Sequence, residues 1–304
     1  MKSKILLTGA SGFVGRHVID ELGSDYELHA VSTSTQQLPG IEKQFHWDKL
    51  HDVNDSYLAV IHLAGLAHDT SSSAGEQAYF DVNQGLTRKL LDHCIQLHPK
   101  TFIYLSSVKA VVDSTSDTIV TEETPSSATN VYGRSKLAAE KEVAKAELKA
   151  TKICLRPVMI YGKGQKGNLT TLEKLIHRGI PFPFKYWKNQ RSVLFITNLT
   201  KVLRRLVETP IASGTYFVAD DEATSTVGLL KYIGEGMRKK PRFVPVPNGL
   251  IRFLRSLLPQ KVKHTADKIL GSLEVDNNKL KSELGITQMP FATQQGFVLT
   301  YSKS

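Results

Sequence analysis

The feature that most constrains the fold is a glycine-rich run near the N-terminus, placed between a short apolar run and an amphipathic stretch. The apolar run is Lys4 to Thr8, the amphipathic stretch begins at Phe13, and the glycines are Gly9, Gly12 and Gly15. Glycine at these spacings permits a tight turn, a close backbone approach to a ligand, and packing of a helix against a strand. The helix N-terminus adds N–H groups and the positive end of a dipole. The run predicts a βα unit that binds the pyrophosphate of a dinucleotide; the alternative is a glycine-rich turn without a ligand.

Apolar runs alternate with amphipathic stretches through the first half of the chain, which is typical of a parallel sheet covered by crossover helices. The expected buried strands are Lys4 to Thr8, Glu27 to Ser32, Gln44 to Trp47, Leu58 to Leu63, Thr101 to Ser106 and Lys152 to Leu155. The helical patterns between them cover residues 13–22, 76–98 and 131–148. We therefore predict an α/β fold with a doubly wound, Rossmann-like parallel sheet.

The pattern changes after about residue 160, where prolines interrupt short helices and strands. Tyr186 to Ile196 and Gly214 to Ala219 have strand-like composition, and a short helix is expected from Asp276 to a C-terminal cap at Gly285. These features predict a smaller, mixed C-terminal lobe. We expect residues 1–165 to form a dinucleotide-binding domain and residues 166–304 to form mainly a substrate lobe, with segments near 190–220 returning to the first domain.

The net charge and the composition limit the classes of molecule that the chain is expected to bind. The chain has 39 Lys plus Arg against 29 Asp plus Glu, a net charge of +10, which favours anionic partners such as phosphate groups. Hydrophobic residues make up 41% of the sequence, which excludes wholesale disorder. The lysines are scattered along the sequence, no aromatic residues are interleaved with them, and no nucleic-acid-binding fold is recognisable. We therefore expect the charge to serve cofactor and substrate phosphates, and no nucleic acid partner.

The remaining composition signals concern compartment and metal. Cys94 and Cys154 form neither a disulfide framework nor a CxxC pair, and the histidines show no spacing of paired metal ligands, so we expect no metal. Met1 leads straight into a strand-like run, and no uncharged apolar run approaches the about 18 residues of a membrane span. The sequence thus predicts a cytoplasmic protein without stable membrane insertion.

The residues after the second predicted strand bear on the choice of cofactor. A carboxylate there would hold the adenosine ribose, but the sequence is Val31-Ser32-Thr33-Ser34-Thr35. Hydroxyl groups can accept a 2′-phosphate, with Arg16 available to pair with it. This favours NADP(H), while NAD(H) stays open because hydroxyls also hold a ribose. Asp48, after the third strand, is a candidate for the adenine amino group or a plain solvated turn residue.

A proton-transfer site is indicated by Tyr132 and Lys136, which lie four residues apart on one face of a predicted helix. A nearby ammonium and an oxidised nicotinamide ring would favour the phenolate; bringing the pKa of a tyrosine from about 10 to about 7 requires about 4 kcal/mol. Ser107 follows a predicted strand at the carboxyl edge of the sheet and suits a substrate oxygen. We expect Tyr132 to move the proton, Lys136 to tune it and hold the nicotinamide ribose, and Ser107 to orient the sugar oxygen.

With these residues in view, the chain resembles the extended short-chain dehydrogenases/reductases, and specifically nucleotide-sugar epimerases and 4-keto reductases. The runs that carry the resemblance are Thr8-Gly9-Ala10-Ser11-Gly12-Phe13-Val14-Gly15, His62-Leu63-Ala64-Gly65, Asp81-Val82-Asn83, Leu105-Ser106-Ser107, Tyr132-Gly133-Arg134-Ser135-Lys136 and Leu155-Arg156-Pro157-Val158-Met159-Ile160-Tyr161-Gly162. The resemblance implies that Ser107, Tyr132 and Lys136 are the catalytic triad. It also implies that Asn83 supports the site and that Pro157 abuts the nicotinamide. The expected cofactor contacts are Gly9, Ser11, Gly12, Phe13, Val14, Gly15, Arg16, Asp48, Leu63, Ala64, Gly65, Asn83, Tyr132, Lys136 and Pro157.

Three later segments resemble enzymes that finish UDP-linked N-acetylated deoxyhexoses for bacterial surface polysaccharides. They are residues 162–168, 189–192 and 271–276. Within them Asn168 can bond a pyrophosphate or a base edge, and Arg191 can grip a diphosphate with its forked guanidinium. The alternative for Arg191 is a salt bridge between the lobes. We expect Ser107, Asn168 and Arg191 to contact a nucleotide-sugar substrate.

The expected activity is therefore hydride transfer at C4 of a UDP-linked hexose. Reduction of a 4-keto sugar is preferred, because a reductase exchanges NADPH at each turnover and the acid that commonly holds NAD in epimerases is missing after the second strand. UDP-hexose or UDP-N-acetylhexosamine 4-epimerisation is the alternative. A non-catalytic NADP-binding regulatory protein is an alternative of another class, against which Tyr132 and Lys136 argue. The sequence is compatible with a homodimer but shows no interface.

One basic amphipathic stretch, Gly249 to Leu258, has two interpretations. It can contact a membrane surface, or it can form a helix that covers the substrate lobe. The second interpretation explains the pattern at least as well.

Overall fold

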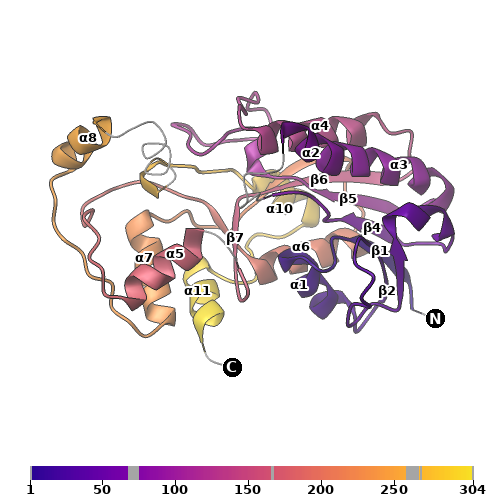
Figure 1. The fold of residues 1–304 in the computed structure, drawn as a ribbon, viewed down its shortest axis with the longest axis horizontal. Coiled ribbons are helices and arrows are strands. Elements are labelled where there is room, and N and C mark those ends of the chain that lie inside the picture. The colour runs from indigo at the N-terminus through magenta and orange to yellow at the C-terminus, as the bar shows by residue number, and fades with distance from the viewer. Residues whose placement is uncertain (1, 68–74, 166–167, 258–266, 268, 303–304) are drawn as a thin grey trace.

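The parallel sheet is confirmed. The computed structural model describes residues 2–67, 75–165, 168–257, 267 and 269–302 of the chain (Figure 1). The strands of the main sheet are β1 (Lys4–Thr8), β2 (Glu27–Ser32), β3 (Lys43–His46), β4 (Ala59–His62), β5 (Thr101–Leu105), β6 (Thr151–Pro157) and β9 (Gly214–Val218). They lie in the order β3-β2-β1-β4-β5-β6-β9, and every neighbouring pair is parallel. The order reverses between β1 and β4, and open α/β sheets bind ligands at such a switch point, beyond the carboxyl ends of the strands.

Helices cover both faces of this sheet (Figure 1). On one face lie α3 (Leu86–Leu97) and α4 (Val131–Lys145), and on the other lie α1 (Phe13–Leu22) and α6 (Ile196–Glu208). Successive residues of a strand enter opposite cores: Ile5 and Leu7 pack on the α1 and α6 side, and Leu6 packs on the α3 and α4 side. The inner strands β1, β4 and β5 are largely apolar because both of their faces are buried, whereas the edge strand β3 is polar and only partly buried.

The helical pattern predicted over residues 76–98 is confirmed as one continuous helical run, which contains an unforeseen π-turn. The segment contains α2 (Glu76–Phe80), a π-helical turn η2 (Asp81–Gly85) and α3. A π-turn inserts an extra residue without interrupting the helical run, so the apolar periodicity of the sequence does not reveal it. The turn contains Asn83, whose side chain is fully buried.

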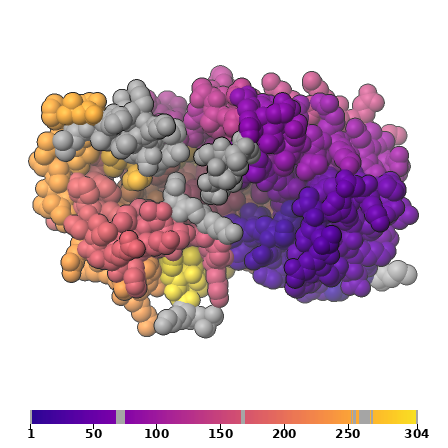
Figure 2. Space-filling model, in the orientation of Figure 1, coloured from indigo at the N-terminus to yellow at the C-terminus, as the bar shows by residue number. Residues whose placement is uncertain are grey.

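The remaining elements form the C-terminal lobe, and Figure 2 shows it beside the residues of the first half of the chain. Its two-stranded parallel sheet pairs β7 (Met159–Tyr161) with β8 (Val193–Phe195). Its helices are α5 (Asn168–His177), α7 (Thr226–Gly236), α8 (Asn248–Ser256) and α11 (Thr293–Tyr301), whereas α10 (Asn278–Leu284) packs on β9 of the main sheet. Gly285 ends α10 in the left-handed conformation, with φ of 62°, as predicted for this cap. Among the described residues, none of the helices is long and apolar enough to span a membrane.

A buried polar junction ties α11 to both sheets. Asp220, directly after Ala219, accepts hydrogen bonds from the backbone N–H of Phe195 at 2.9 Å and from Nδ2 of Asn198 at 2.8 Å. The hydroxyl of Tyr161 lies 2.9 Å from Oδ2 of Asp220 and 2.9 Å from the carbonyl oxygen of Thr293. One hydroxyl proton serves only one of these acceptors. Burial raises the pKa of Asp220 to about 6, and below that pH the protonated carboxyl can donate to the Tyr161 hydroxyl while this hydroxyl donates to Thr293.

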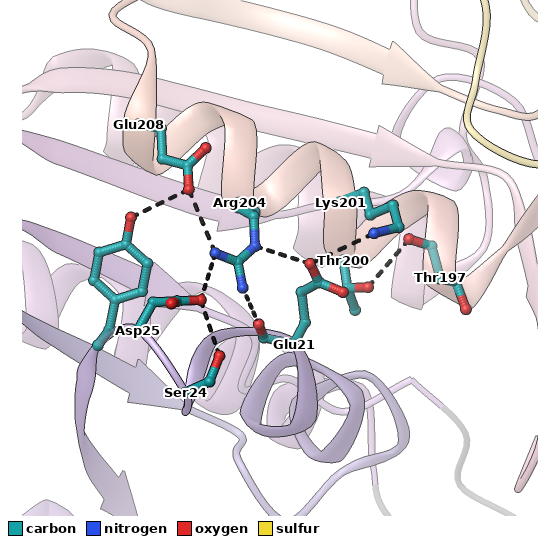
Figure 3. A network of polar contacts seen from close by, with 9 residues as sticks. Glu21, Ser24, Asp25, Thr197, Thr200, Lys201, Arg204 and Glu208 are labelled. Atoms are coloured by element: carbon teal, nitrogen blue, oxygen red, sulfur yellow. Dashed lines mark hydrogen bonds and ion pairs between the residues drawn. The ribbon is translucent and has the colours of Figure 1, made fainter.

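A second polar network joins α1 to α6 at the outer face (Figure 3). Arg204 on α6 donates from Nε to Glu21 at 2.8 Å and from Nη1 to Asp25 at 2.8 Å. Glu208, one turn further along α6, lies 3.5 Å from the same guanidinium. The network fixes the packing of the two helices that cover the face of the sheet beneath the glycine-rich turn.

Candidate active site

The glycine-rich turn lies against the loop that follows β4. Gly9 has φ of 71°, and a Cβ atom on it would lie 2.7 Å from the backbone nitrogen of Ala64. A Cβ atom on Gly15 would lie 2.3 Å from the carbonyl oxygen of Gly9, so the helix can start here only with glycine. Gly12 caps α1 without any side-chain hydrogen bond, and the first turn of α1 has no acidic residue. This leaves backbone N–H groups and the positive end of the helix dipole for an anion, which fits a dinucleotide pyrophosphate.

A buried chain of hydrogen bonds runs beneath this turn. The Ala64 N–H donates to Oγ1 of Thr8 at 3.1 Å, and that oxygen lies 2.6 Å from Nδ1 of His62. Nε2 of His62 lies 2.9 Å from Oγ1 of Thr87, whose own proton goes to the carbonyl oxygen of Asn83 at 2.6 Å. Thr87 must therefore accept from His62, which places the imidazole proton on Nε2 and leaves Nδ1 to accept from Thr8. Burial lowers the pKa of His62 to about 3, so the ring stays neutral.

Asn83 continues the chain to the catalytic helix. Its Oδ1 accepts from the backbone of Leu66 at 2.8 Å, and its Nδ2 donates to Oγ of Ser135 at 2.8 Å. Ser135 in turn donates to the carbonyl oxygen of Tyr132 at 2.8 Å. The supporting role that the resemblance implied for Asn83 thus has a structural counterpart: the residue holds the start of α4 against the loop after β4.

Ser107 and Tyr132 meet where β5 ends and α4 begins. Ser107 caps the short helix η3 (Val108–Ala110), and Asn130 caps α4 by accepting from the Gly133 N–H at 2.8 Å. A Cβ atom on Gly133 would lie 2.1 Å from the carbonyl oxygen of Lys109, so glycine is needed for η3 and α4 to approach this closely. The Ser107 side chain lies close enough to the Tyr132 side chain to lower the pKa of its phenol. Burial raises the pKa of Tyr132 to about 12, against the lowering effect of this serine.

Lys136 lies one turn further along α4, with its ammonium group buried. Its Nζ donates to the carbonyl oxygen of Leu105 at 2.6 Å and lies 4.4 Å from the ring centroid of Tyr104. The same atom would be 3.4 Å from a Cβ atom on Gly65, which places it at the loop after β4. Burial lowers the pKa of Lys136 to about 7, although the charge of Glu140 raises it. In the chain alone the pKa of Tyr132 is therefore raised by burial and not lowered as expected. The Lys136 ammonium, which was expected to lower it, donates to the Leu105 carbonyl instead.

A buried ion pair below this cluster was not foreseen from the sequence. Arg156 on β6 forms a bidentate pair with Glu140 on α4, with N···O distances of 2.9 and 2.7 Å. Ser106 donates to the same carboxylate at 2.5 Å. The pair and Ser106 therefore join the strand end that carries Ser107 to the helix that carries Tyr132. The available signal was the four-residue spacing from Lys136 to Glu140, but such spacing is equally typical of an exposed helix face.

The residues predicted for the outer edge of the cofactor site differ in their surroundings. Arg16 is exposed and donates from Nε to the carbonyl oxygen of Ser11 at 3.1 Å, so it lies over the glycine-rich turn. Pro157 is buried at the carboxyl end of β6. Asp48 has an 84% exposed side chain, and its carboxylate lies 3.2 Å from Nδ1 of His46. Phe13 and Val14 are partly buried and pack on the core beneath α1.

Arg191 lies in the C-terminal lobe beside Gly271. It donates from Nη1 to the carbonyl oxygen of Gly271 at 2.7 Å. Burial lowers its pKa, and among the ion pairs of the described residues none involves it, so the alternative of a salt bridge between the lobes is not seen there. The chain just before it lines a cavity of about 540 Å³ that also contains Thr224 and Ser272. Asn168 is the first residue of α5, and its side chain lies outside the described part of the chain.

Comparison with known proteins identifies the family. Residues 5–219 match the NAD dependent epimerase/dehydratase family. A Vibrio cholerae protein named UDP-glucose 4-epimerase is 30% identical over 99% of this chain and 95% of its own length. The chain belongs to the NAD dependent epimerase/dehydratase family, and it is an enzyme of this family.

Solved structures show the same fold. The UDP-N-acetylglucosamine 4-epimerase from Bacillus cereus superposes with a TM-score of 0.77 at 19% identity, covering 99% of this chain and 98% of that one. MoeE5 in complex with UDP-glucose and NAD gives a TM-score of 0.75 at 21% identity, covering 98% and 97%. The extended short-chain dehydrogenase/reductase resemblance of the sequence is thereby confirmed.

Proposed function

We propose that the protein transfers a hydride at C4 of a UDP-linked hexose. The observation that carries this proposal is the convergence of Ser107, Tyr132 and Lys136 at the carboxyl edge of the sheet, beside the loops after β1 and β4. The names of the full-length relative and of the structural neighbours support a UDP-hexose substrate. A nicotinamide dinucleotide bound along Gly9, Gly12 and Gly15 supplies the hydride acceptor or donor.

Tyr132 is the proton-transferring residue in this proposal. With a pKa of about 12 in the chain alone, its phenol is protonated at neutral pH and ready to donate to a sugar oxygen. Ser107 lies beside this phenol and can orient the same sugar oxygen. Lys136 supplies the cation, which favours the phenolate once its ammonium turns from the Leu105 carbonyl toward the ribose and the phenol.

Arg191 and Asn168 are proposed to hold the diphosphate of the nucleotide sugar. A partly buried guanidinium without an acidic partner among the described residues suits a phosphate group, which accepts two parallel hydrogen bonds from it. Asn168 begins α5, and a helix N-terminus also favours an anion.

Two outcomes at C4 each have an observation in their favour. Epimerisation is supported by the name of the relative that covers 99% of this chain, and NAD is bound in the structural neighbour MoeE5. Reduction of a 4-keto sugar with NADPH is supported by the absence of an acid after β2. There Ser32 and Ser34 provide hydroxyls, and Arg16 lies over the adjacent turn.

Separate assays distinguish these outcomes. The purified chain is incubated with UDP-glucose, UDP-N-acetylglucosamine or the corresponding UDP-4-keto-6-deoxy sugar, with NADH, with NADPH or without added cofactor. Interconversion of 4-epimers without net cofactor use supports epimerisation, and stoichiometric oxidation of NADPH with the keto sugar supports reduction. The Tyr132→Phe variant should lose turnover by about 10²- to 10⁴-fold in either case while still binding the cofactor. Retained turnover in this variant would contradict the catalytic assignment, and Tyr186→Phe, at an exposed tyrosine, is the matched control.

A further inference from the structure

The C-terminal lobe exposes a concentration of apolar side chains around α8. Four of the nine exposed large apolar residues among the described residues lie between Val244 and Leu257. Phe253 is 60% exposed, Leu257 is 66% exposed and Leu250 is 47% exposed. These three residues are spaced three and four apart, so they share one face of the helix and its continuation. Soluble surfaces carry such residues singly, and a cluster of them marks a site of interaction.

Within the described part of the chain, no helix or strand packs extensively on the apolar face of this helix. By sequence α8 is as strongly amphipathic as α6, but the apolar residues of α6 are buried in the core. α5 and α11 pack against α7, whereas no extensive packing of α8 on another described helix or strand is seen. Figure 1 shows α8 at the end of the C-terminal lobe, far from the main sheet. The interpretation of this stretch as a helix that covers the substrate lobe is therefore wrong for the side chains of Leu250 and Phe253.

The segment leading to α8 anchors it to the lobe. The backbone of Phe182 bridges that of Phe243 in parallel fashion, with hydrogen bonds to Arg242 and Val244 on either side. Asn248 then donates to the carbonyl oxygen of Tyr186 at 3.2 Å. Both contacts hold the N-terminal side of α8 at the lobe.

The charge of the same segment determines which partner fits. Between Gly236 and Leu257 the sequence has no Asp or Glu, and its cations are Arg238, Lys239, Lys240, Arg242, Arg252 and Arg255. An acid-free basic segment attracts an anionic surface, and an apolar helix face enters an apolar phase. Both properties together are typical of helices that lie in the plane of a membrane interface.

We propose that the apolar face formed by Leu250, Phe253 and Leu257, within the acid-free basic segment between Gly236 and Leu257, docks the enzyme on an anionic lipid membrane. The helix lies parallel to the membrane surface, its apolar side chains enter the headgroup region, and the basic residues contact lipid phosphates. Binding is peripheral and weakens as salt screens the charges. The proposal does not depend on the reaction at C4.

Vesicle sedimentation with the full chain tests this proposal. Wild-type protein should sediment with vesicles of phosphatidylethanolamine and phosphatidylglycerol at about 0.1 M ionic strength and less with pure phosphatidylcholine. The double variant Phe253→Ser/Leu257→Ser should bind at least about tenfold more weakly, since two large apolar side chains no longer enter the interface. The matched control is Ile95→Ser/Ile119→Ser, which removes two exposed apolar residues elsewhere and should bind like wild type. Lys240→Gln/Arg242→Gln should reduce the preference for anionic vesicles.

The fold of each variant is verified by thermal unfolding and by cofactor binding, which none of these substitutions should alter. Wild-type protein that stays in the supernatant with anionic vesicles overturns the proposal, as does equal binding by the two apolar double variants. Size-exclusion chromatography with light scattering tests whether a second copy of the chain occupies this face instead. A dimer that dissociates in Phe253→Ser/Leu257→Ser, without vesicle binding by wild type, overturns the proposal and assigns the face to a second copy of the chain.

Discussion

The hydroxyl of Ser107 acts on the ionisation of Tyr132. Because the neighbouring hydroxyl lowers the pKa of the phenol, Ser107→Ala should raise that pKa and shift the basic limb of the pH profile of turnover to higher pH. Ser107→Thr keeps a hydroxyl and should restore the profile. The measurement is kcat/KM against pH for the three proteins. A lower rate in Ser107→Ala with an unshifted profile would show that the serine only positions the substrate.

Lys136 makes the stability of the protein depend on pH. Its folded pKa of about 7 lies below the ordinary value of 10.5, because burial disfavours the charged form. Between these pH values the unfolded chain binds a proton that the folded chain does not, so the free energy of unfolding rises with pH there, by at most about 1.4 kcal/mol per pH unit. Below about pH 7 the charge is buried in the folded state and destabilises it.

Replacing Lys136 with methionine removes this dependence. The free energy of unfolding of wild type minus that of Lys136→Met should be larger at about pH 9 than at about pH 6, measured by urea denaturation. Lys141→Met, at an exposed lysine of the same helix, is the control. A wild-type and variant difference that stays constant between the two pH values would refute the burial of a titrating ammonium at this position.

Single residues differ in how well the sequence predicts them. Ser107, Tyr132 and Lys136 were predicted because each belongs to a local motif. The structure places Ser107 beside Tyr132 and the Lys136 ammonium on the last residue of β5, and their catalytic roles stay predictions. Glu140 and Arg156 come from elements far apart in the chain, and only the packing of α4 on β6 makes their pair buried. No local spacing carries that information. The pairing of these two side chains therefore could not be predicted from the sequence.

At the scale of elements, the junction of β8, β9 and α11 has its own titration. Burial raises the folded pKa of Asp220 to about 6 from an ordinary value of 3.8. The folded chain then retains a proton that the unfolded chain has lost, and the free energy of unfolding contributed by Asp220 falls as pH rises from about 4 to 6. Above about pH 6, the ionised carboxylate leaves the Tyr161 hydroxyl with two acceptors for one proton.

Asp220→Asn mimics the protonated acid, since its amide can donate to Tyr161 and accept from Phe195. The melting temperature of the variant minus that of wild type should increase from about pH 4 to about pH 6 and then level off. Differential scanning calorimetry across this range measures it, with Asp48→Asn as a control at a carboxylate that is 84% exposed. The assignment fails if the difference does not change with pH.

The observed bounds of helices and strands match the predicted ones where the apolar periodicity and the turn residues indicate the same ends. β1, α1 and β2 have the predicted bounds, because glycines or polar turns separate them. The π-turn at Asp81–Gly85 was missed, because it conserves the helical run while it redirects the side chain of Asn83. The prediction of strand character over Tyr186 to Ile196 is met by β8, at Val193–Phe195, and by isolated β-bridges from Arg191 to Thr224 and Leu273.

At the scale of the whole molecule, sequence alternation predicted a parallel sheet but could not order its strands. β9 pairs with β6 although α5, β8 and α6 come between them in the chain. Such pairing depends on contacts between distant segments, to which local periodicity is blind. The strand order matters for function, since it places the switch point between β1 and β4, where the glycine-rich turn and the loop at Ala64 meet.

The two lobes should respond to different ligands. The cofactor is proposed to bind along the sheet, and the diphosphate of the nucleotide sugar at Arg191 in the other lobe. A ligand that binds only the folded protein stabilises it, by about 2.7 kcal/mol when the ligand concentration is a hundred times Kd. Such a ligand therefore raises the melting temperature. NAD or NADP and UDP should each raise the melting temperature of wild type.

In Arg191→Met the shift with UDP should be lost while the shift with the dinucleotide remains, because a phosphate then has no guanidinium partner there. Arg88→Met removes an arginine that pairs with Glu142 on the outer surface and should keep both shifts. An undiminished UDP shift in Arg191→Met would place the diphosphate elsewhere, and loss of both shifts would indicate that the substitution disturbs the fold.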